Sequence, residues 1–375
     1  DARPALNRAI DAALAAPCLR GGIQAVIIQG LEDGATWYER NSDTLLLPAS
    51  NQKLLTTAAA LDLLGAECRY STRLLTKEAD PKAGVVHGDV YLKGSGDPFL
   101  GEADLDDIVR QTRSRGITRV VGRVVGDGSC FSGPKYGCGW SWDDMSYRYS
   151  APVTGLNLNH NVVTISVLPS KKIGSPAVVR VTPSNSVVRI INRTLTVADT
   201  ETALRVERTL GRNTIEVEGH VPVGAPADTR AAVEATVEDP PLYAAQRLTD
   251  KLRAAGISVT RAASQGSAPA TCAFIIAEHN GQPMSQLIAL INKPSDNLGA
   301  ECLLRTIGLE RRGKGTDVAG IEAVVEWLQS LGVQRNGVIM RDGSGLSRMN
   351  YVTARTIATV LRSMRTRPTS DAWLA

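Results

Sequence analysis

The feature that most constrains the fold is a long β-rich stretch, residues 76–285, enclosed by two segments with clear helical patterns. Short runs of Val, Ile and Thr, broken by Gly, Pro, Asn and Asp, fill most of it, as expected for strands joined by turns. Examples are VVHGDVYLKG, VVRIINRTLTV and NTIEVEGHVPVG. Helices are predicted at 103–116 and from Pro240 onward. Residues 176–236 are almost all β in pattern and are predicted to form a subdomain.

The flanking segments have a different texture. Residues 1–75 predict a helix, two strands at 24–30 and 35–41, and a helix at 52–65 that is apolar on nearly every face and therefore buried. Residues 286–375 return to helices. These are predicted at 285–292, 298–311, 316–332 and 353–366, with a strand at 337–343.

The fold class is therefore predicted as α/β. The simplest organisation is one domain split in sequence into 1–75 and 286–375, with the β-rich region 76–285 inserted between its halves. A chain of 375 residues is long enough for two or three structural units, so three independent domains are the alternative.

Composition excludes several functions. The net charge of +4 and the absence of a Lys/Arg run argue against a nucleic-acid partner. The sequence has no run of about 18 apolar residues, so no transmembrane helix is predicted. The chain opens on an amphipathic helical pattern, which is typical of a secreted protein trimmed of its leader and also of a cytosolic one.

Metal and cofactor sites are not expected either. The four histidines lie far apart without ligand spacing, and the Gly-rich GSGDPF segment lacks the pattern of a phosphate-binding loop. The six cysteines form no CxxC pair. Cys130 and Cys138 flank a short Gly/Pro-containing loop and are candidates for a disulfide. For the other four cysteines, buried free thiols are at least as good an explanation as disulfides.

Ser50 and Lys53 are the first candidate catalytic pair. Their i, i+3 spacing places both on one face at the start of the apolar helix, where backbone N–H groups favour negative charge on an attacking oxygen. A serine hydroxyl needs a base, and a lysine whose pKa is lowered by burial can serve as one. Ser-x-x-Lys also arises by chance roughly once or twice in a chain of this length. The pair gains weight because a lysine in an otherwise apolar helix requires a partner or a function.

Two polar loops supply further candidates. Ser295, Asp296 and Asn297 follow Pro294 between two predicted helices, so a helix-capping role for Ser295 or Asn297 is one interpretation. In the functional interpretation Ser295 relays protons beside Lys53 and Asn297 hydrogen-bonds a substrate amide.

The third element, DGSGLSR (342–348), has the glycine pattern of a tight turn after a strand. As turn chemistry it needs no function. Ser344 and Gly345, together with Asp296, are candidates for substrate binding. A Ser-His-Asp triad has no GxSxG motif to support it.

Ser-x-x-Lys followed far downstream by Ser-Asp-Asn resembles the active-site pattern of penicillin-recognising serine enzymes, whose third element is Lys-Thr-Gly. The first two match PASNQK (48–53) and KPSDNLGAE (293–301), and the long gap between them is similar to that of the class C low-molecular-mass penicillin-binding proteins. Further similar segments extend the resemblance along nearly the whole chain. These are VYLKGSGDPFL, VVGDGSCF, APVTGLNLNHN and DGSGLSRMNYVTA.

The resemblance implies a penicillin-binding, transpeptidase-like fold and a D-alanyl-D-alanine carboxypeptidase or endopeptidase. It implies catalytic Ser50, Lys53, Ser295 and Asn297, no cofactor, and acyl transfer through Ser50 on peptidoglycan stem peptides ending in D-Ala-D-Ala. It also implies inhibition by β-lactams and a bacterial protein that is periplasmic or extracellular.

One departure is the missing Lys-Thr-Gly, which does not follow DGSGLSR before Ala375. A natural chain that continues further is the favoured expectation, and a degenerate member without turnover is the other. The alternative functions are a non-catalytic envelope protein that binds peptidoglycan, and a β-lactamase or esterase with the same chemistry. The long insertion argues against the latter.

Overall fold

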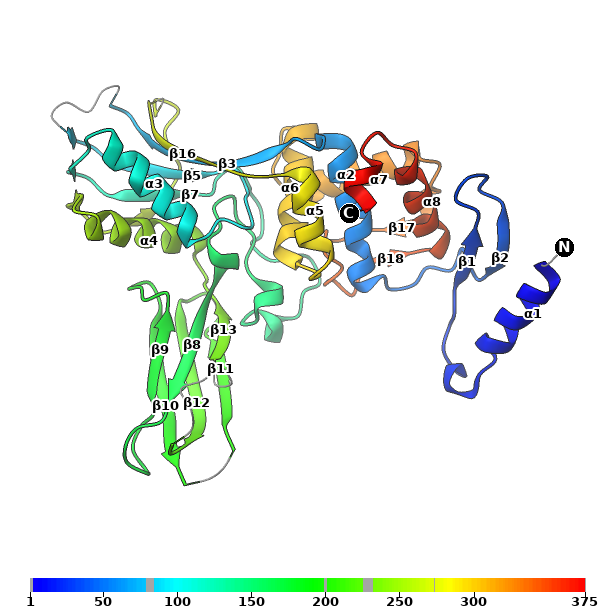
Figure 1. The fold of residues 1–375 in the computed structure, drawn as a ribbon, viewed down its shortest axis with the longest axis horizontal. Helices are drawn as coiled ribbons and strands as arrows, with labels where there is room; N and C mark the ends of the chain where they lie inside the picture. Colours follow the sequence, from blue (N-terminus) through cyan, green and yellow to red (C-terminus); the bar gives the residue numbers. More distant parts are fainter. Residues whose placement is uncertain (1–2, 79–83, 199–200, 225–231, 273, 375) are drawn as a thin grey trace.

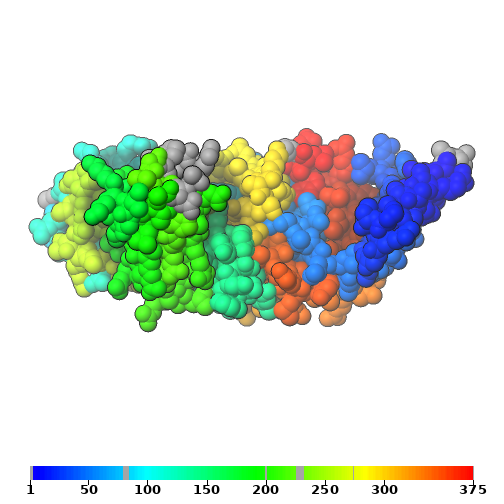
Figure 2. All heavy atoms as spheres, turned by 90° about the horizontal axis from the view of Figure 1, so that it is seen from below, coloured from blue at the N-terminus to red at the C-terminus, as the bar shows by residue number. Residues whose placement is uncertain are grey.

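The computed structural model describes residues 3–374 except 79–83, 199–200, 225–231 and 273. The molecule is elongated (Figure 1). Figure 2 shows the β-rich region, in green, toward one end of the molecule and the N-terminal segment, in blue, at the other end. None of the helices in the described ranges is long and apolar enough to cross a membrane.

A bundle of helices surrounds α2 (Gln52–Leu64). It consists of α5 (Met284–Asn292), α6 (Asn297–Arg312), α7 (Asp317–Ser330) and α8 (Ala354–Arg365). Three consecutive alanines, 58–60, are fully buried in α2, and their small side chains let the neighbouring helices approach closely. The prediction of a helix buried on nearly every face is therefore confirmed. Helices from both ends of the sequence share one apolar core here (Figure 1).

Short strands lie beside this bundle. The N-terminal segment contains α1 (Arg3–Leu14) and the antiparallel pair β1 (Val26–Gln29) and β2 (Thr36–Arg40), as predicted. A second pair joins β17 (Val338–Ile339) to β18 (Tyr351–Val352), and α9 (Ser370–Leu374) follows α8. The strand predicted at 337–343 is therefore only two residues long. Beyond Ile339 the N–H groups of Arg341 and Asp342 donate to Asn350 Oδ1 and that of Gly343 to Glu301 Oε1, so side chains take the place of a partner strand.

A five-stranded sheet has the order β15-β7-β5-β3-β16. Four of its strands come from the predicted insertion 76–285, but β3 begins at Arg69, within the predicted N-terminal segment. Its strands are β3 (Arg69–Thr76), β5 (Val90–Gly94), β7 (Val124–Asp127), β15 (Ser264–Gln265) and β16 (Phe274–Pro283). β5, β7 and β15 run parallel to one another. Helix α3 (Glu102–Ser114) packs on β16, and α4 (Pro240–Ala254) packs on β7. A small parallel sheet of β14 (Ser258–Val259), β6 (Arg119–Val120) and β4 (Val85–Val86) lies in the same region.

Two three-stranded sheets form a projection from this layer (Figure 1). One contains β13 (Ala232–Thr236), β8 (Val162–Leu168) and β9 (Val178–Thr182), and the other β10 (Arg189–Val197), β12 (Thr214–Pro222) and β11 (Ala203–Arg208). The subdomain was predicted to begin at residue 176, but its central strand β8 already begins at Val162. One apolar cluster extends from the five-stranded sheet into this projection and contains no residue of the helical bundle's cluster. This separation supports the split-domain organisation, which stays a prediction.

The disulfide predicted as a candidate between Cys130 and Cys138 is not present. All six cysteines lie within the described residues and are free thiols, so Cys130 and Cys138 form no disulfide. The Cys130 sulfur packs against Gly155, where an added Cβ would lie 2.3 Å from it, while Cys138 is exposed. Burial raises the pKa of Cys130 to about 12, which keeps it an unreactive thiol.

Candidate active site

Ser50 lies in the single 3₁₀ turn Ala49–Asn51 that leads directly into α2. Its side chain is exposed, so an incoming carbonyl carbon has access to Oγ. The preceding residue, Ala49, has a φ of +46°, a left-handed conformation that is rare for a residue with a Cβ. The turn therefore presents Ser50 at the mouth of a buried helix, as the Pro-Ala-Ser sequence suggested.

Lys53 lies one turn further along α2 and is 2% exposed. Its Nζ donates to three oxygens: Asn297 Oδ1 at 2.6 Å, the Ser344 carbonyl at 2.8 Å and Ser50 Oγ at 3.3 Å. Three acceptors match the three protons of an ammonium group. Burial lowers the pKa of Lys53, and the opposing charges of Glu301, Asp342 and Asp296 act in the raising direction. The lysine is thus held beside the nucleophile and is easier to deprotonate than an exposed one.

Ser295 completes a short chain of hydroxyl groups. Its Oγ donates to Ser50 Oγ at 2.7 Å. Ser295 also has a left-handed φ, of +60°, so unusual backbone conformations occur on both sides of the reacting oxygen. Asn297 links Lys53 to a further segment, because its Oδ1 accepts from Lys53 and its Nδ2 donates to the Tyr149 carbonyl at 2.7 Å. The structure therefore brings together all four residues predicted as catalytic, from two segments far apart in sequence.

Asp296 has a structural role that the sequence assigned to its neighbours. It is the N-cap of α6, and its Oδ1 accepts from Gly299 N at 2.7 Å, so the helix cap is neither Ser295 nor Asn297. Its Oδ2 lies 3.3 Å from His160 Nδ1. His160 was missed by the sequence analysis. In the sequence His160 stands between two asparagines, which tolerate a left-handed φ, and in the structure all three residues adopt one.

Ser344 and Gly345 lie on the inner side of the site. Ser344 is fully buried, and its carbonyl oxygen, not its hydroxyl, contacts Lys53. Gly345 touches the Ser50 turn, because a Cβ placed on it would lie 1.8 Å from the Ala49 carbonyl oxygen. Both residues hold the lysine and the serine turn in position, and their contact with substrate stays a prediction, as does that of Asp296.

A buried network fixes the loop that carries Ser344. Glu301 Oε1 accepts from the N–H groups of Gly343 and Ser344 at 3.0 and 2.8 Å. Asp342 accepts from several groups, including Trp140 Nε1 at 2.9 Å and Asn350 Nδ2 at 2.7 Å. Burial, reinforced by the charge of Asp342, raises the pKa of Glu301 to about 7. Asp342 was singled out from the sequence only as part of the DGSGLSR turn, and no role was predicted for Glu301, Trp140 or Asn350.

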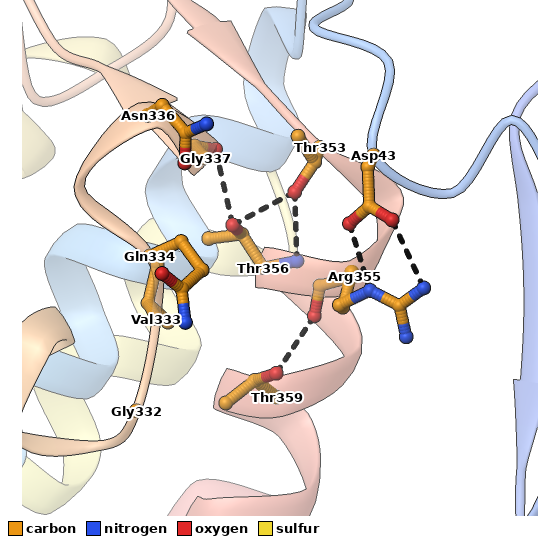
Figure 3. Close-up of a pocket in the computed structure, with 10 residues that line it drawn as sticks. All are labelled: Asp43, Gly332, Val333, Gln334, Asn336, Gly337, Thr353, Arg355, Thr356 and Thr359. Atoms are coloured by element: carbon orange, nitrogen blue, oxygen red, sulfur yellow. Dashed lines mark hydrogen bonds and ion pairs between the residues drawn. The ribbon is translucent and has the colours of Figure 1, made fainter.

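A separate hollow of about 520 Å³ lies at the start of α8 (Figure 3). Its cation, Arg355, is already paired with Asp43 at 2.7 Å and Glu39 at 2.8 Å. The threonines at 353, 356 and 359 are hydrogen-bonded within the helix start. This hollow shares no lining residue with the Ser50 cluster. Within the described ranges, no group of three or more His, Cys, Asp or Glu side chains is arranged to hold a metal ion.

Known proteins are similar to this chain over most of its length. Residues 6–375 match the model of the D-Ala-D-Ala carboxypeptidase 3 (S13) family. The chain is 34% identical to a D-alanyl-D-alanine carboxypeptidase of Actinomadura sp. (strain R39), over 99% of this chain and 70% of that protein. It is 27% identical to D-alanyl-D-alanine carboxypeptidase DacB of Haemophilus influenzae, over 86% of this chain and 66% of that protein.

Solved structures give the same result. The crystal structure of penicillin binding protein 4 (dacB) from Haemophilus influenzae superimposes with a TM-score of 0.80 and 25% identity, covering 93% of this chain and 76% of that one. A second structure of that protein, complexed with a β-lactam, matches with a TM-score of 0.73 and 24% identity, over 92% of this chain and 74% of that one. The chain thus spans between two thirds and about three quarters of the length of these relatives.

Proposed function

The chain belongs to the D-Ala-D-Ala carboxypeptidase 3 (S13) family, and from this premise we propose that Ser50 is its nucleophile and Lys53 the base that activates it. The substrates proposed are peptidoglycan stem peptides ending in D-Ala-D-Ala, with β-lactams as acylating inhibitors. The compartment proposed is periplasmic or extracellular. The observation that carries the assignment is the contact of Ser50 Oγ with both Lys53 Nζ, at 3.3 Å, and Ser295 Oγ, at 2.7 Å.

Acylation begins from neutral Lys53. Lys53 accepts the proton of Ser50, and Ser50 Oγ attacks the carbonyl carbon of the penultimate D-alanine. Backbone N–H groups, including that of Ser50, stabilise the oxyanion. Collapse of the tetrahedral intermediate breaks the C–N bond. The leaving amine receives the proton through Ser295, which restores neutral Lys53 and leaves an acyl ester on Ser50.

Deacylation repeats these steps with water. Lys53, assisted by Ser295, accepts a proton from a water molecule whose oxygen attacks the ester carbonyl. The C–O bond to Ser50 breaks, and Ser50 recovers the proton. A β-lactam follows the first half of this route, and its opened ring stays attached to Ser50. Asn297 is assigned the hydrogen bonds that orient Lys53 and the substrate amide.

The experiment that tests the proposal is covalent labelling with benzylpenicillin, read by intact mass and by mapping of the modified peptide. We expect one adduct, on Ser50, and none in Ser50→Ala. The matched control Ser114→Ala, a serine on α3 outside the cluster, should label like the wild type. Label retained in Ser50→Ala would assign the nucleophile elsewhere. No label on a chain that includes a Lys-Thr-Gly strand would favour a non-catalytic peptidoglycan-binding protein, whereas no label on residues 1–375 would show only that this third motif is needed.

A further inference from the structure

A second hollow, of about 300 Å³, lies where the inserted five-stranded sheet meets α6. Its walls include Gly128 and Ser129 after β7, Ser267 after β15, and Pro241 at the start of α4. β7 and β15 are neighbouring parallel strands, so their carboxyl ends lie together. In open α/β sheets this edge, facing a helix N-terminus, is where small ligands bind. The hollow therefore occupies the position at which such a sheet offers a binding site.

Arg305 forms the floor of this hollow from the side of the helical bundle. It is 2% exposed, and its Nη2 donates to the Pro134 carbonyl at 2.5 Å. Its Nε has no hydrogen-bond partner among the described residues. No Asp or Glu among those residues forms an ion pair with the Arg305 side chain. A guanidinium remains charged inside a protein. A buried cation without a counter-ion is unfavourable, and an anion in the hollow would relieve it.

The other charged groups around the hollow already have partners. Lys135 at the rim lies 3.0 Å from Asp239 Oδ1. Asp127 accepts from the N–H groups of Ser129 and Ala268, each at 2.9 Å. Of the two cations among the described residues that line the hollow, Arg305 is therefore the one without an ion pair.

Glu301, one helical turn before Arg305, faces the active site. Its Oε1 accepts from the N–H groups of the Gly343–Ser344 loop. The charge of Arg305 acts to lower the pKa of Glu301, so the two side chains are electrostatic neighbours without forming an ion pair. Arg305 thus lines the hollow without forming an ion pair with Glu301.

We propose that this hollow binds a small monocarboxylate, with Arg305 as its counter-ion and the hydroxyl groups of Ser129 and Ser267 as further donors. One unpaired cation matches one negative charge, and the nearby carboxylates of Asp127 and Asp239 disfavour a dianion. The volume is suited to an amino acid or a smaller acid. The site shares no residue with the Ser50 cluster and does not depend on its chemistry.

The test is ligand binding to the full 375-residue chain, measured as the shift of its thermal unfolding midpoint. The probes are sodium acetate, D-alanine and inorganic phosphate, each against sodium chloride at equal ionic strength. A ligand that binds only the native state raises the midpoint in a saturable way. We expect this for acetate or D-alanine. A saturable shift with phosphate alone would overturn the carboxylate assignment, and no saturable shift with any probe would overturn the site.

Variants locate the binding. Arg305→Met should raise the half-saturating concentration roughly tenfold or more, whereas Arg311→Met, an exposed arginine on the same helix, should leave it unchanged. Ser267→Phe fills the rim without removing a charge and should also abolish the shift, so the test survives if Arg305→Met does not fold. Penicillin labelling of Ser50 should persist in Ser267→Phe. Undiminished binding in both Arg305→Met and Ser267→Phe would overturn the proposal.

Discussion

Lys53 Nζ lies 2.6 Å from Asn297 Oδ1, although the two residues are 244 positions apart in the sequence. The same nitrogen lies 2.8 Å from the Ser344 carbonyl, so three separate segments meet at one amine. These contacts satisfy the protonated amine, while burial favours the neutral one. The balance between the two forms determines how readily Lys53 can act as a base.

Asn297→Ala removes one acceptor from Lys53 and the donor to the Tyr149 carbonyl. Loss of a hydrogen bond to a charged group costs about 1.5–3 kcal/mol, so we expect acylation by a fluorescent penicillin to slow by about 10- to 100-fold. The thermal midpoint should change little. Asn280→Ala, an exposed asparagine on β16, is the matched control. An unchanged labelling rate would remove Asn297 from the proposed machinery.

The acylation rate should rise with pH and level off below about pH 10.4, the pKa of an exposed lysine. Lys53 accepts a proton only when neutral, and burial lowers its pKa, so the active form accumulates at lower pH than it would in water. The unfolded chain then binds more protons than the native one between the two pKa values, and this residue makes the free energy of unfolding increase with pH in that window. A stopped-flow pH profile measures the first effect. A rate that falls as pH rises toward 9 would contradict Lys53 as the base.

Gly345→Ala should damage the site far more than Gly313→Ala. Both glycines have a left-handed φ, +84° and +69°, so both substitutions carry a backbone cost of about 1–2 kcal/mol. Only at position 345 would the new methyl group collide with the Ala49 carbonyl, while position 313 has open space around it. We expect Gly345→Ala to lose penicillin labelling by at least about 100-fold. Gly313→Ala should label normally, and equal behaviour of the two variants would show that the contact with Ala49 is unimportant.

Arg208→Met should destabilise the protein and slow acylation. The fully buried guanidinium, from β11 of the projection, lies 2.5 Å from Glu238 and donates to the carbonyl of Met145, in the loop whose Tyr149 contacts Asn297. Removing it leaves the buried Glu238 with only Lys135 at 3.6 Å and the Tyr136 hydroxyl at 2.9 Å, so we expect a loss of about 3 kcal/mol in the free energy of unfolding.

The matched control is Arg205→Met, on the same strand but largely exposed. Its free energy of unfolding should change by about 0.5 kcal/mol or less. Urea unfolding measures stability, and the labelling rate of the folded fraction measures the effect on the site. A normal rate in folded Arg208→Met would mean that the projection does not influence the catalytic loop.

The sequence alone determined features that depend on near neighbours. The i, i+3 spacing of Ser50 and Lys53 fixed their common face, and the apolar pattern of 52–65 required burial of the helix that carries them. Helical periodicity located the four later helices of the bundle to within a few residues. The order of the motifs also indicated the family, which the family match confirms.

Tertiary structure decided what acts on those residues. The contacts of Lys53 with the Ser344 carbonyl, of Glu301 with the Gly343–Ser344 loop, and of His160 with Asp296 join segments that have no local relationship in the sequence. For the same reason, the short spacing of Cys130 and Cys138 did not predict their actual surroundings. Side-chain direction and burial depend on how distant elements pack. These two properties determine which groups are paired and which pKa values are shifted, and they leave the buried Nε of Arg305 without a hydrogen-bond partner among the described residues.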